Sequence, residues 1–110
     1  LRLRLRETSF LFTGDLERDA EERLLEAGLI EPVDVLKVAH HGSRTSSTEA
    51  FLDAARPSLA IISCGAGNRY GHPDPGVLER LRGAGASVLR TDQRGGVIVQ
   101  SDGERLSVRR

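Results

Sequence analysis

Three histidines and one aspartate follow apolar segments, where their side chains could bind a metal ion or a phosphate group. His40 and His41 are adjacent, directly after the apolar run VLKVA and directly before a glycine. Asp15 follows FLFTG, and His72 follows the apolar run LAIISC and a glycine-rich loop. Imidazole and carboxylate groups together suit Zn²⁺, Mn²⁺ or Fe and need no cysteine ligand. The pattern favours a metal or phosphate site.

Each of these residues also has a purely structural interpretation. Asp15 could cap the helix that follows it, and the His40–His41 pair could be one packed and one exposed side chain. Gly42 and Ser43, next to the pair, could begin a helix or could place backbone amides around an anion. Tyr70 and its neighbour Arg69 suit a surface loop and a substrate contact equally. Each residue alone is therefore weak evidence for a site.

The periodicity of the chain predicts the elements that would position these residues. LRLRLR alternates strictly and predicts a half-buried strand over 1–6, antiparallel to a second strand over 10–15. The expected elements after these are a helix over 16–27, a strand over 34–39, a helix over 45–55, a buried central strand over 59–65, a helix over 73–82 and strands over 87–92, 96–100 and 105–109. This order predicts an α/β protein with a mixed sheet and a final β-meander. Because loops converge at the carboxyl ends of parallel strands, the four candidate residues are expected at one edge.

Composition limits the class of protein. The chain has 110 residues, which is one domain or part of one, and its 16 basic and 16 acidic residues give zero formal net charge. That balance excludes a whole-molecule attraction to nucleic acid, so polyanion binding would need a local patch or a metal. Cys64 is the single cysteine, which excludes an internal disulfide. No apolar stretch is long enough to span a bilayer, and a strand that starts at Leu1 suggests a piece of a longer protein.

Taken together, the motifs TGD (13–15), DVLKVAHHGS (34–43), AIIS (60–63), NRYGHP (68–73) and RTD (90–92) resemble a metallo-β-lactamase-like domain. More narrowly, the pattern resembles the domain carried by ComEC-type DNA internalisation proteins of competent bacteria. The resemblance implies an αββα sandwich, of which residues 1–110 would form a partial domain, roughly the C-terminal half.

The resemblance also implies roles for individual residues. Asp15 matches a carboxylate that bridges two metals, and His72 matches a histidine that ligates the second metal. His40 and His41 match a catalytic position that contacts the substrate phosphate or acts as general acid. His40 is the favoured member of the pair because it leaves the strand first, and its assignment as a metal ligand stays open. Ser43 and Asn68 are expected to line the same pocket and bind substrate.

One departure from the family pattern limits what this chain can do alone. The family's metal cluster begins with an upstream His-x-His/Asp-x-Asp-His segment, and no histidine precedes His40 here. Two divalent ions, Zn or Mn, are expected in the intact domain, whereas this chain supplies two of their ligands. A working metal centre generally needs three protein ligands per ion. The chain alone is therefore expected to be inactive, and whether it alone binds any metal stays open.

Several functions remain open from the sequence. The first is a metal-dependent phosphodiesterase or nuclease that hydrolyses DNA in a DNA-uptake protein. The alternative is an inactive scaffold or DNA-binding module of a membrane DNA channel, and a further one is a separate chain that assembles with another copy or with an N-terminal half. The expected partners are DNA, the upstream half of the domain and the channel part of a protein of the bacterial cytoplasmic membrane. Self-association through the β-rich face is also expected.

Overall fold

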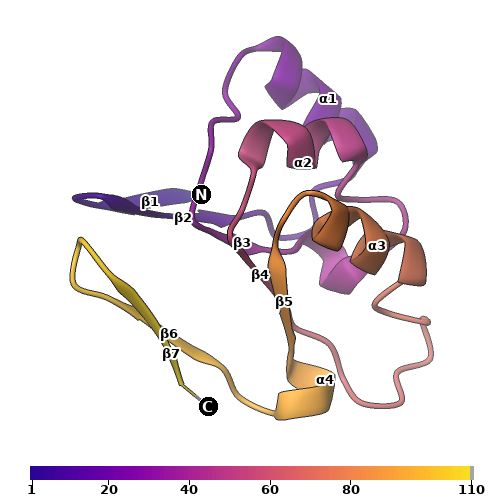
Figure 1. Cartoon of the computed structure of the whole chain (residues 1–110). Coiled ribbons are helices and arrows are strands. Elements are labelled where there is room, and N and C mark those ends of the chain that lie inside the picture. Colours follow the sequence, from indigo (N-terminus) through magenta and orange to yellow (C-terminus); the bar gives the residue numbers. More distant parts are fainter. Residues whose placement is uncertain (110) are drawn as a thin grey trace.

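The structure, a computed structural model that describes residues 1–109, is a five-stranded sheet with three helices on one face and a two-stranded hairpin on the other (Figure 1). The elements are β1 (Arg2–Leu5), β2 (Thr8–Phe12), α1 (Arg18–Glu26), β3 (Val35–Lys37), the 3₁₀ turn η1 (Ala39–Gly42), α2 (Glu49–Ala55), β4 (Leu59–Ile62), α3 (Pro75–Gly83), β5 (Ser87–Arg90), α4 (Thr91–Arg94), β6 (Ile98–Ser101) and β7 (Leu106–Arg109). The prediction of an α/β chain with a mixed sheet is confirmed.

The strand order explains why the helices share a face. The sheet runs β1-β2-β3-β4-β5, with β1 antiparallel to β2 and each later pair parallel. Each parallel step crosses over through one helix, α1, α2 or α3. Parallel crossovers are right-handed, and three successive steps in one direction therefore put all three helices on the same side. Figure 1 shows this layer beside the sheet.

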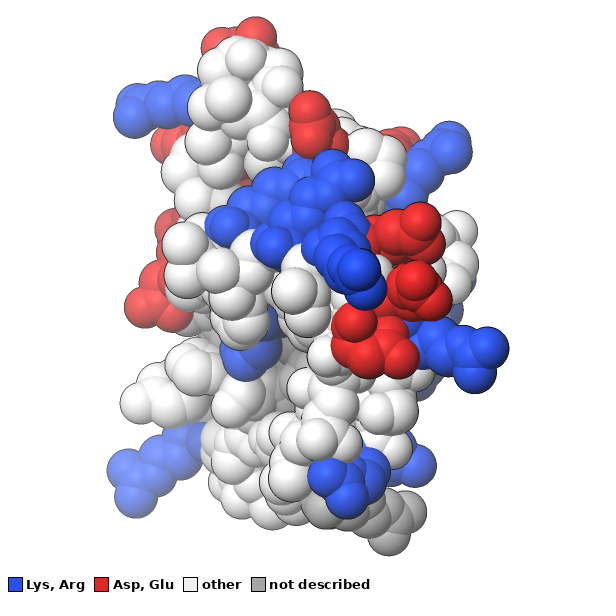
Figure 2. Space-filling view, turned by 90° about the vertical axis from the view of Figure 1, so that its left-hand side faces the viewer, with Lys and Arg blue, Asp and Glu red and all other residues white. Residues whose placement is uncertain are grey.

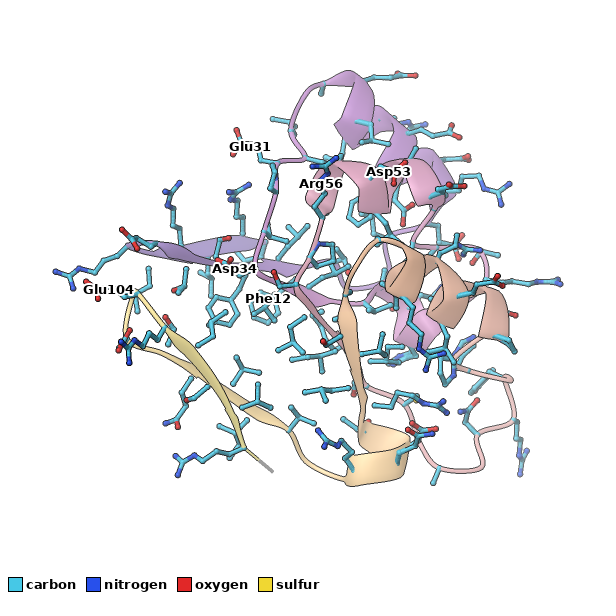
Figure 3. The ribbon with its side chains drawn as sticks, viewed as in Figure 1. Phe12, Glu31, Asp34, Asp53, Arg56 and Glu104 are labelled. Carbon is cyan, nitrogen blue, oxygen red and sulfur yellow. The ribbon has the colours of Figure 1, made fainter. Side chains whose placement is uncertain are left out.

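The core lies between the sheet and these helices. Leu36 and Ile62 from the strands, Phe51 from α2 and Leu81 from α3 are fully buried there. Residues that alternate with the buried strand positions point to the other face, where Phe10 and other apolar side chains line a cavity of about 350 Å³ under the hairpin. Figure 3 shows side chains, Phe12 among them, in this space between sheet and hairpin.

The predicted three-stranded meander is wrong in one respect. Residues 87–90 pair in parallel with β4 in the main sheet, with Leu89 opposite Ile61, so only β6 and β7 form the final hairpin. Val88 explains the difference, since it packs against the helix-side core and ties this strand to the large sheet. The segment after it, expected as strand and turn, forms the short helix α4.

An ion pair at the start of α4 gives a prediction about acid stability. Arg90 Nε and its terminal nitrogen donate to Asp92 Oδ1 and Oδ2 at 3.0 and 2.7 Å, and both side chains are largely buried. The hydrogen bonds from Arg90 lower the pKa of the Asp92 carboxyl. A lowered folded-state pKa contributes stability above the unfolded pKa, about 3.9, which is lost as the pH falls through the folded-state pKa.

We therefore expect Asp92→Asn to lower the free energy of unfolding by about 1–3 kcal/mol at pH 7, because the bidentate pair is lost. The difference from wild type should shrink below about pH 4. Urea unfolding at pH 7 and pH 2.5 measures this, with Asp53→Asn on the exposed side of α2 as control. An Asp92→Asn deficit that is equal at both pH values would contradict the prediction.

The sheet face opposite the helices carries an exposed leucine stripe beside the hairpin. Leu3 pairs with Phe10 and lies on the same face of the sheet. Leu1 and Leu5 also lie on that face, because they alternate with the arginines of β1, which point to the opposite face. Leu3 is 50% exposed. Apolar surface of this kind favours association.

We expect the chain to self-associate through this stripe at concentrations on the order of tens of micromolar, and Leu3→Lys to shift it towards monomer. Light scattering reports the mass. Leu29→Lys is the matched control, because Leu29 is 64% exposed but lies between α1 and β3, away from the stripe. A wild-type monomer at these concentrations would contradict the prediction.

None of the helices in residues 1–109 is long and apolar enough to cross a membrane.

Candidate metal and phosphate site

The His-His-Gly turn after β3 has an uncommon backbone. His40 (φ 50°, ψ 41°), His41 (φ 56°, ψ 25°) and Gly42 (φ 83°) are consecutive left-handed residues. That conformation costs a residue with a Cβ roughly 1–2 kcal/mol. Two backbone hydrogen bonds hold it: His40 N donates to Gly14 O at 2.8 Å, and Ser43 N donates to His40 O at 2.9 Å. Strain of this kind gathers at functional sites, so the turn is a candidate site in its own right.

The loop that carries His72 is organised by Asn68. The Asn68 amide group donates to Gly65 O at 3.0 Å and to His72 O at 2.5 Å. Its Oδ1 accepts from Tyr70 N at 3.1 Å and from His72 N at 3.0 Å. Two donors and two acceptor positions are all that an asparagine side chain offers. Asn68 thus uses its full hydrogen-bonding capacity within its own loop and positions His72, while its expected role in binding substrate stays a prediction.

The turn and the loop bring the three imidazoles together. The ring of His72 lies 5.9 Å from that of His40, edge to face, and 6.4 Å from that of His41, nearly parallel to it. Gly42 makes the approach possible, since Asp74 N donates to Gly42 O at 2.9 Å and Pro73 packs directly against Gly42. The predicted convergence of all three histidines at one sheet edge is what the structure shows.

The two histidines of the turn have different surroundings. His41 Nδ1 lies 2.6 Å from Ser63 O, and because a carbonyl only accepts, Nδ1 carries the proton and Nε2 is left free. His40 Nδ1 is buried and lies 3.1 Å from Glu17 Oε1, without an aligned hydrogen bond. His40 therefore lies next to a carboxylate without a hydrogen bond to it, whereas a backbone carbonyl holds His41 in position.

A cavity of about 260 Å³ opens beside this cluster. The residues that line it are His41, Ser63, Cys64, Gly65, Asn68, Tyr70 and His72. His40 and Ser43 are not among them. Burial lowers the pKa of His72, and the charges of His40 and His41 lower it further. A lowered pKa keeps that imidazole neutral, with a lone pair available. Burial raises the pKa of the Cys64 thiol, so it stays a neutral side chain.

Asp15 and Ser43 lie apart from this cavity. The N-cap residue of α1 is Glu17, so Asp15 does not cap that helix. Asp15 is exposed and lines a separate open cavity with the first turn of α1. Ser43 Oγ lies 2.9 Å from Thr45 Oγ1 and helps to shape the segment before α2. The structure thus places Asp15 on the neighbouring strand end, beside the histidines but outside their cavity.

The side chains near the cavity are of the types that bind a divalent metal, but too few of them are placed together to hold one. His72 offers a neutral imidazole, His41 a free Nε2, and Asp15 an exposed carboxylate, which are suitable ligands for zinc or manganese. Within residues 1–109, however, no group of three or more His, Cys, Asp or Glu side chains is placed to hold an ion. The described residues therefore offer suitable donor types but do not form a complete set of ligands, and the metal site stays a prediction.

Two contributors to the site were not assigned from the sequence. Glu17, which lies next to His40, is two positions after Asp15, and nothing in its spacing distinguishes it from a helix-start glutamate. Tyr70, which was left equally as surface or substrate contact, stacks on His72 with ring centroids 5.7 Å apart. The position of Tyr70 within the YGHP motif, two residues before His72, was the sequence feature that could have indicated this contact.

Residues 1–66 match the Metallo-beta-lactamase superfamily, and the chain belongs to it. Among curated proteins it is similar to ComE operon protein 3 of Bacillus subtilis, with 46% identity over 87 residues (79% of this chain, 11% of that protein). It is also similar to competence protein ComA of Neisseria gonorrhoeae, with 43% identity over 88 residues (79% and 13%), and to recombination protein 2 of Haemophilus influenzae, with 40% identity over 100 residues (91% and 12%).

These relatives confirm the resemblance to competence proteins that the motifs indicate. The chain spans only 11–13% of the length of the three relatives. The shared region therefore identifies a family of domains, while the activity and partners of the whole protein are matters for proposal.

Proposed function

We propose that this chain supplies one side of a two-metal phosphodiesterase centre that hydrolyses DNA in a competence protein. The observation that supports it most is the convergence of three imidazoles from two separate loops, two of which, those of His41 and His72, line one cavity. The remaining partners in the proposal are the other half of the same domain and a DNA channel in the bacterial cytoplasmic membrane.

Asp15 and His72 are the residues proposed to hold the metal ions, Zn²⁺ or Mn²⁺. Bound metal ions lower the pKa of a bound water towards neutrality and so supply a hydroxide nucleophile. His72 suits a ligand because its lowered pKa favours the neutral form, and Asn68 hydrogen-bonds both its backbone N–H and its carbonyl oxygen. Asp15 is tied to the histidine turn through the bond from His40 N to Gly14 O.

His41 is proposed to contact the phosphate. Its Nδ1 is anchored on Ser63 O and the residue lines the cavity, so Nε2, when protonated, is free to donate to a phosphate oxygen or to the leaving oxygen. His40, favoured by its place on the strand, lies instead next to Glu17 and outside the cavity lining. We therefore assign His40 to supporting the cluster, with its neighbour making the contact.

A cleavage assay tests the proposal. The chain alone, with its incomplete ligand set, should not cleave DNA in the presence of Mn²⁺ or Zn²⁺. A chimera in which this chain replaces the matching 87 residues of the relative ComE operon protein 3 should cleave it. His72→Ala and His41→Ala in that chimera should each reduce the rate about a hundredfold or more. Full cleavage by the His72→Ala chimera would overturn the assignment.

A non-catalytic DNA-binding module is the second candidate, and an arginine-lined groove favours it. Arg2, Arg4 and Arg56 line a cavity of about 290 Å³ between β1 and the end of α2. Figure 2 shows basic side chains gathered on this side of the molecule with acidic ones next to them, and Figure 3 labels Arg56. DNA binding that is salt-dependent, weakened by Arg4→Ala and Arg56→Ala, and accompanied by no cleavage in the chimera would support this candidate.

A further inference from the structure

We propose that Tyr70 is a stacking platform for an unpaired nucleobase, next to the phosphate that the histidine cluster contacts. The choice of a nucleic acid rests on the proposed function. The stacking itself can be tested without any cleavage. The proposal identifies a recognition residue and predicts a preference for single-stranded substrate.

The exposure and orientation of Tyr70 suggest this role. The residue is 81% exposed, although it is a large aromatic side chain. Its ring is within 28° of parallel to that of His72, which is within 21° of parallel to that of His41. Tyr70 is therefore the outermost member of a row of rings that begins at the proposed phosphate contact, and it lines the same cavity.

The backbone of Tyr70 is anchored before any ligand arrives, and its ring already packs on that of His72. Tyr70 N donates to Asn68 Oδ1 at 3.1 Å, and Asn68 is itself anchored to Gly65 and His72. An anchored backbone and an existing ring contact reduce the conformational freedom that is lost on binding, which favours affinity. Singly exposed apolar residues are common on protein surfaces, but this one is fixed on a polar loop and stacked on the candidate site.

Stacking on an aromatic side chain suits a nucleobase of any sequence because every base has a π-face. It requires an unpaired base, since bases inside a duplex already stack on both neighbours. The row of rings therefore fits one strand whose phosphate lies at His41 and whose adjacent base lies against Tyr70. The chain's zero net charge agrees with recognition through local contacts rather than through a general attraction to polyanions.

Tyrosine fluorescence tests the proposal directly, because the chain has one tyrosine and no tryptophan. The chain is titrated, with a metal chelator present, against a short single-stranded oligothymidylate and against an abasic oligonucleotide of the same length. We expect the base-containing strand to quench Tyr70 and to bind about tenfold more tightly than the abasic strand. Equal affinity and equal quenching by the two strands would overturn the proposal, as would no binding of either.

Substitutions separate stacking from other contacts. Anisotropy of a labelled oligothymidylate should show affinity about tenfold weaker for Tyr70→Ala and close to wild type for Tyr70→Phe, which keeps the ring. Wild-type affinity in Tyr70→Ala would contradict the proposal. Because chelator is present, loss of base-dependent binding refutes the stacking alone. The proposed catalytic function is tested separately, by cleavage in the chimera with metal.

Discussion

Gly42→Ala is expected to lower the free energy of unfolding by about 3 kcal/mol and to separate the two loops of the candidate site. Gly42 has φ +83°, and an added Cβ would lie 2.7 Å from Pro73 Cβ and 3.0 Å from Pro73 Cα. The left-handed backbone costs an alanine roughly 1–2 kcal/mol, and overpacking against a buried proline adds about 1–3 kcal/mol. The backbone of Pro73 cannot rotate away as a flexible side chain could.

Urea unfolding measures the loss of stability for Gly42→Ala. Gly65→Ala is the matched control, because Gly65 lies in the other loop of the site, has no positive φ and has open space around it. Its expected change is below about 1 kcal/mol. If Gly42→Ala were within that same margin, the close approach of Gly42 and Pro73 would not be a determinant of the fold.

Asn68→Ala is expected to release the loop that carries His72 and to cost about 2–3 kcal/mol. Four hydrogen bonds of the Asn68 side chain are lost, each worth about 1 kcal/mol or less net, and some of the freed groups regain water. Asn68→Asp should also destabilise the chain, because a carboxylate would face Gly65 O and His72 O without a donor.

Two measurements check the role of Asn68. Urea unfolding gives the stability, and the ring proton resonances of His72 report whether its surroundings change. Arg69→Ala, at the exposed neighbouring position, is the control and should leave both unchanged. Unchanged stability and unchanged His72 resonances in Asn68→Ala would show that the loop is held by its backbone alone.

Much of the fold could be predicted because its patterns are local. LRLRLR alternates in polarity, and the structure pairs it antiparallel with β2 as expected. Thr48, among the expected N-caps, does accept from Phe51 N. The predicted meander was wrong because a short segment such as SVLR does not indicate which strand it pairs with. The packing of Val88 against the core places this segment next to β4.

The site could be predicted only in part, for a related reason. That His40, His41 and His72 converge follows from their places after parallel strands. The left-handed conformation of two successive histidines could not be predicted, because it depends on the hydrogen bond from His40 N to Gly14 O and on the packing of Pro73. Tertiary contacts also decide that His40 lies next to Glu17 and that His41 bonds Ser63 O.

The central claim is that this chain contributes ligands to a metal centre, and a Zn²⁺ titration followed by NMR tests it most directly. The chain has three histidines, so their ring resonances can be assigned by substitution. We expect Zn²⁺ to shift His72 first, and Asp15→Ala and His72→Ala each to weaken binding by about tenfold. Leu29→Ala, distant from the site, should leave binding unchanged. Zinc binding that leaves His72 unshifted, or that survives both substitutions undiminished, would contradict the account.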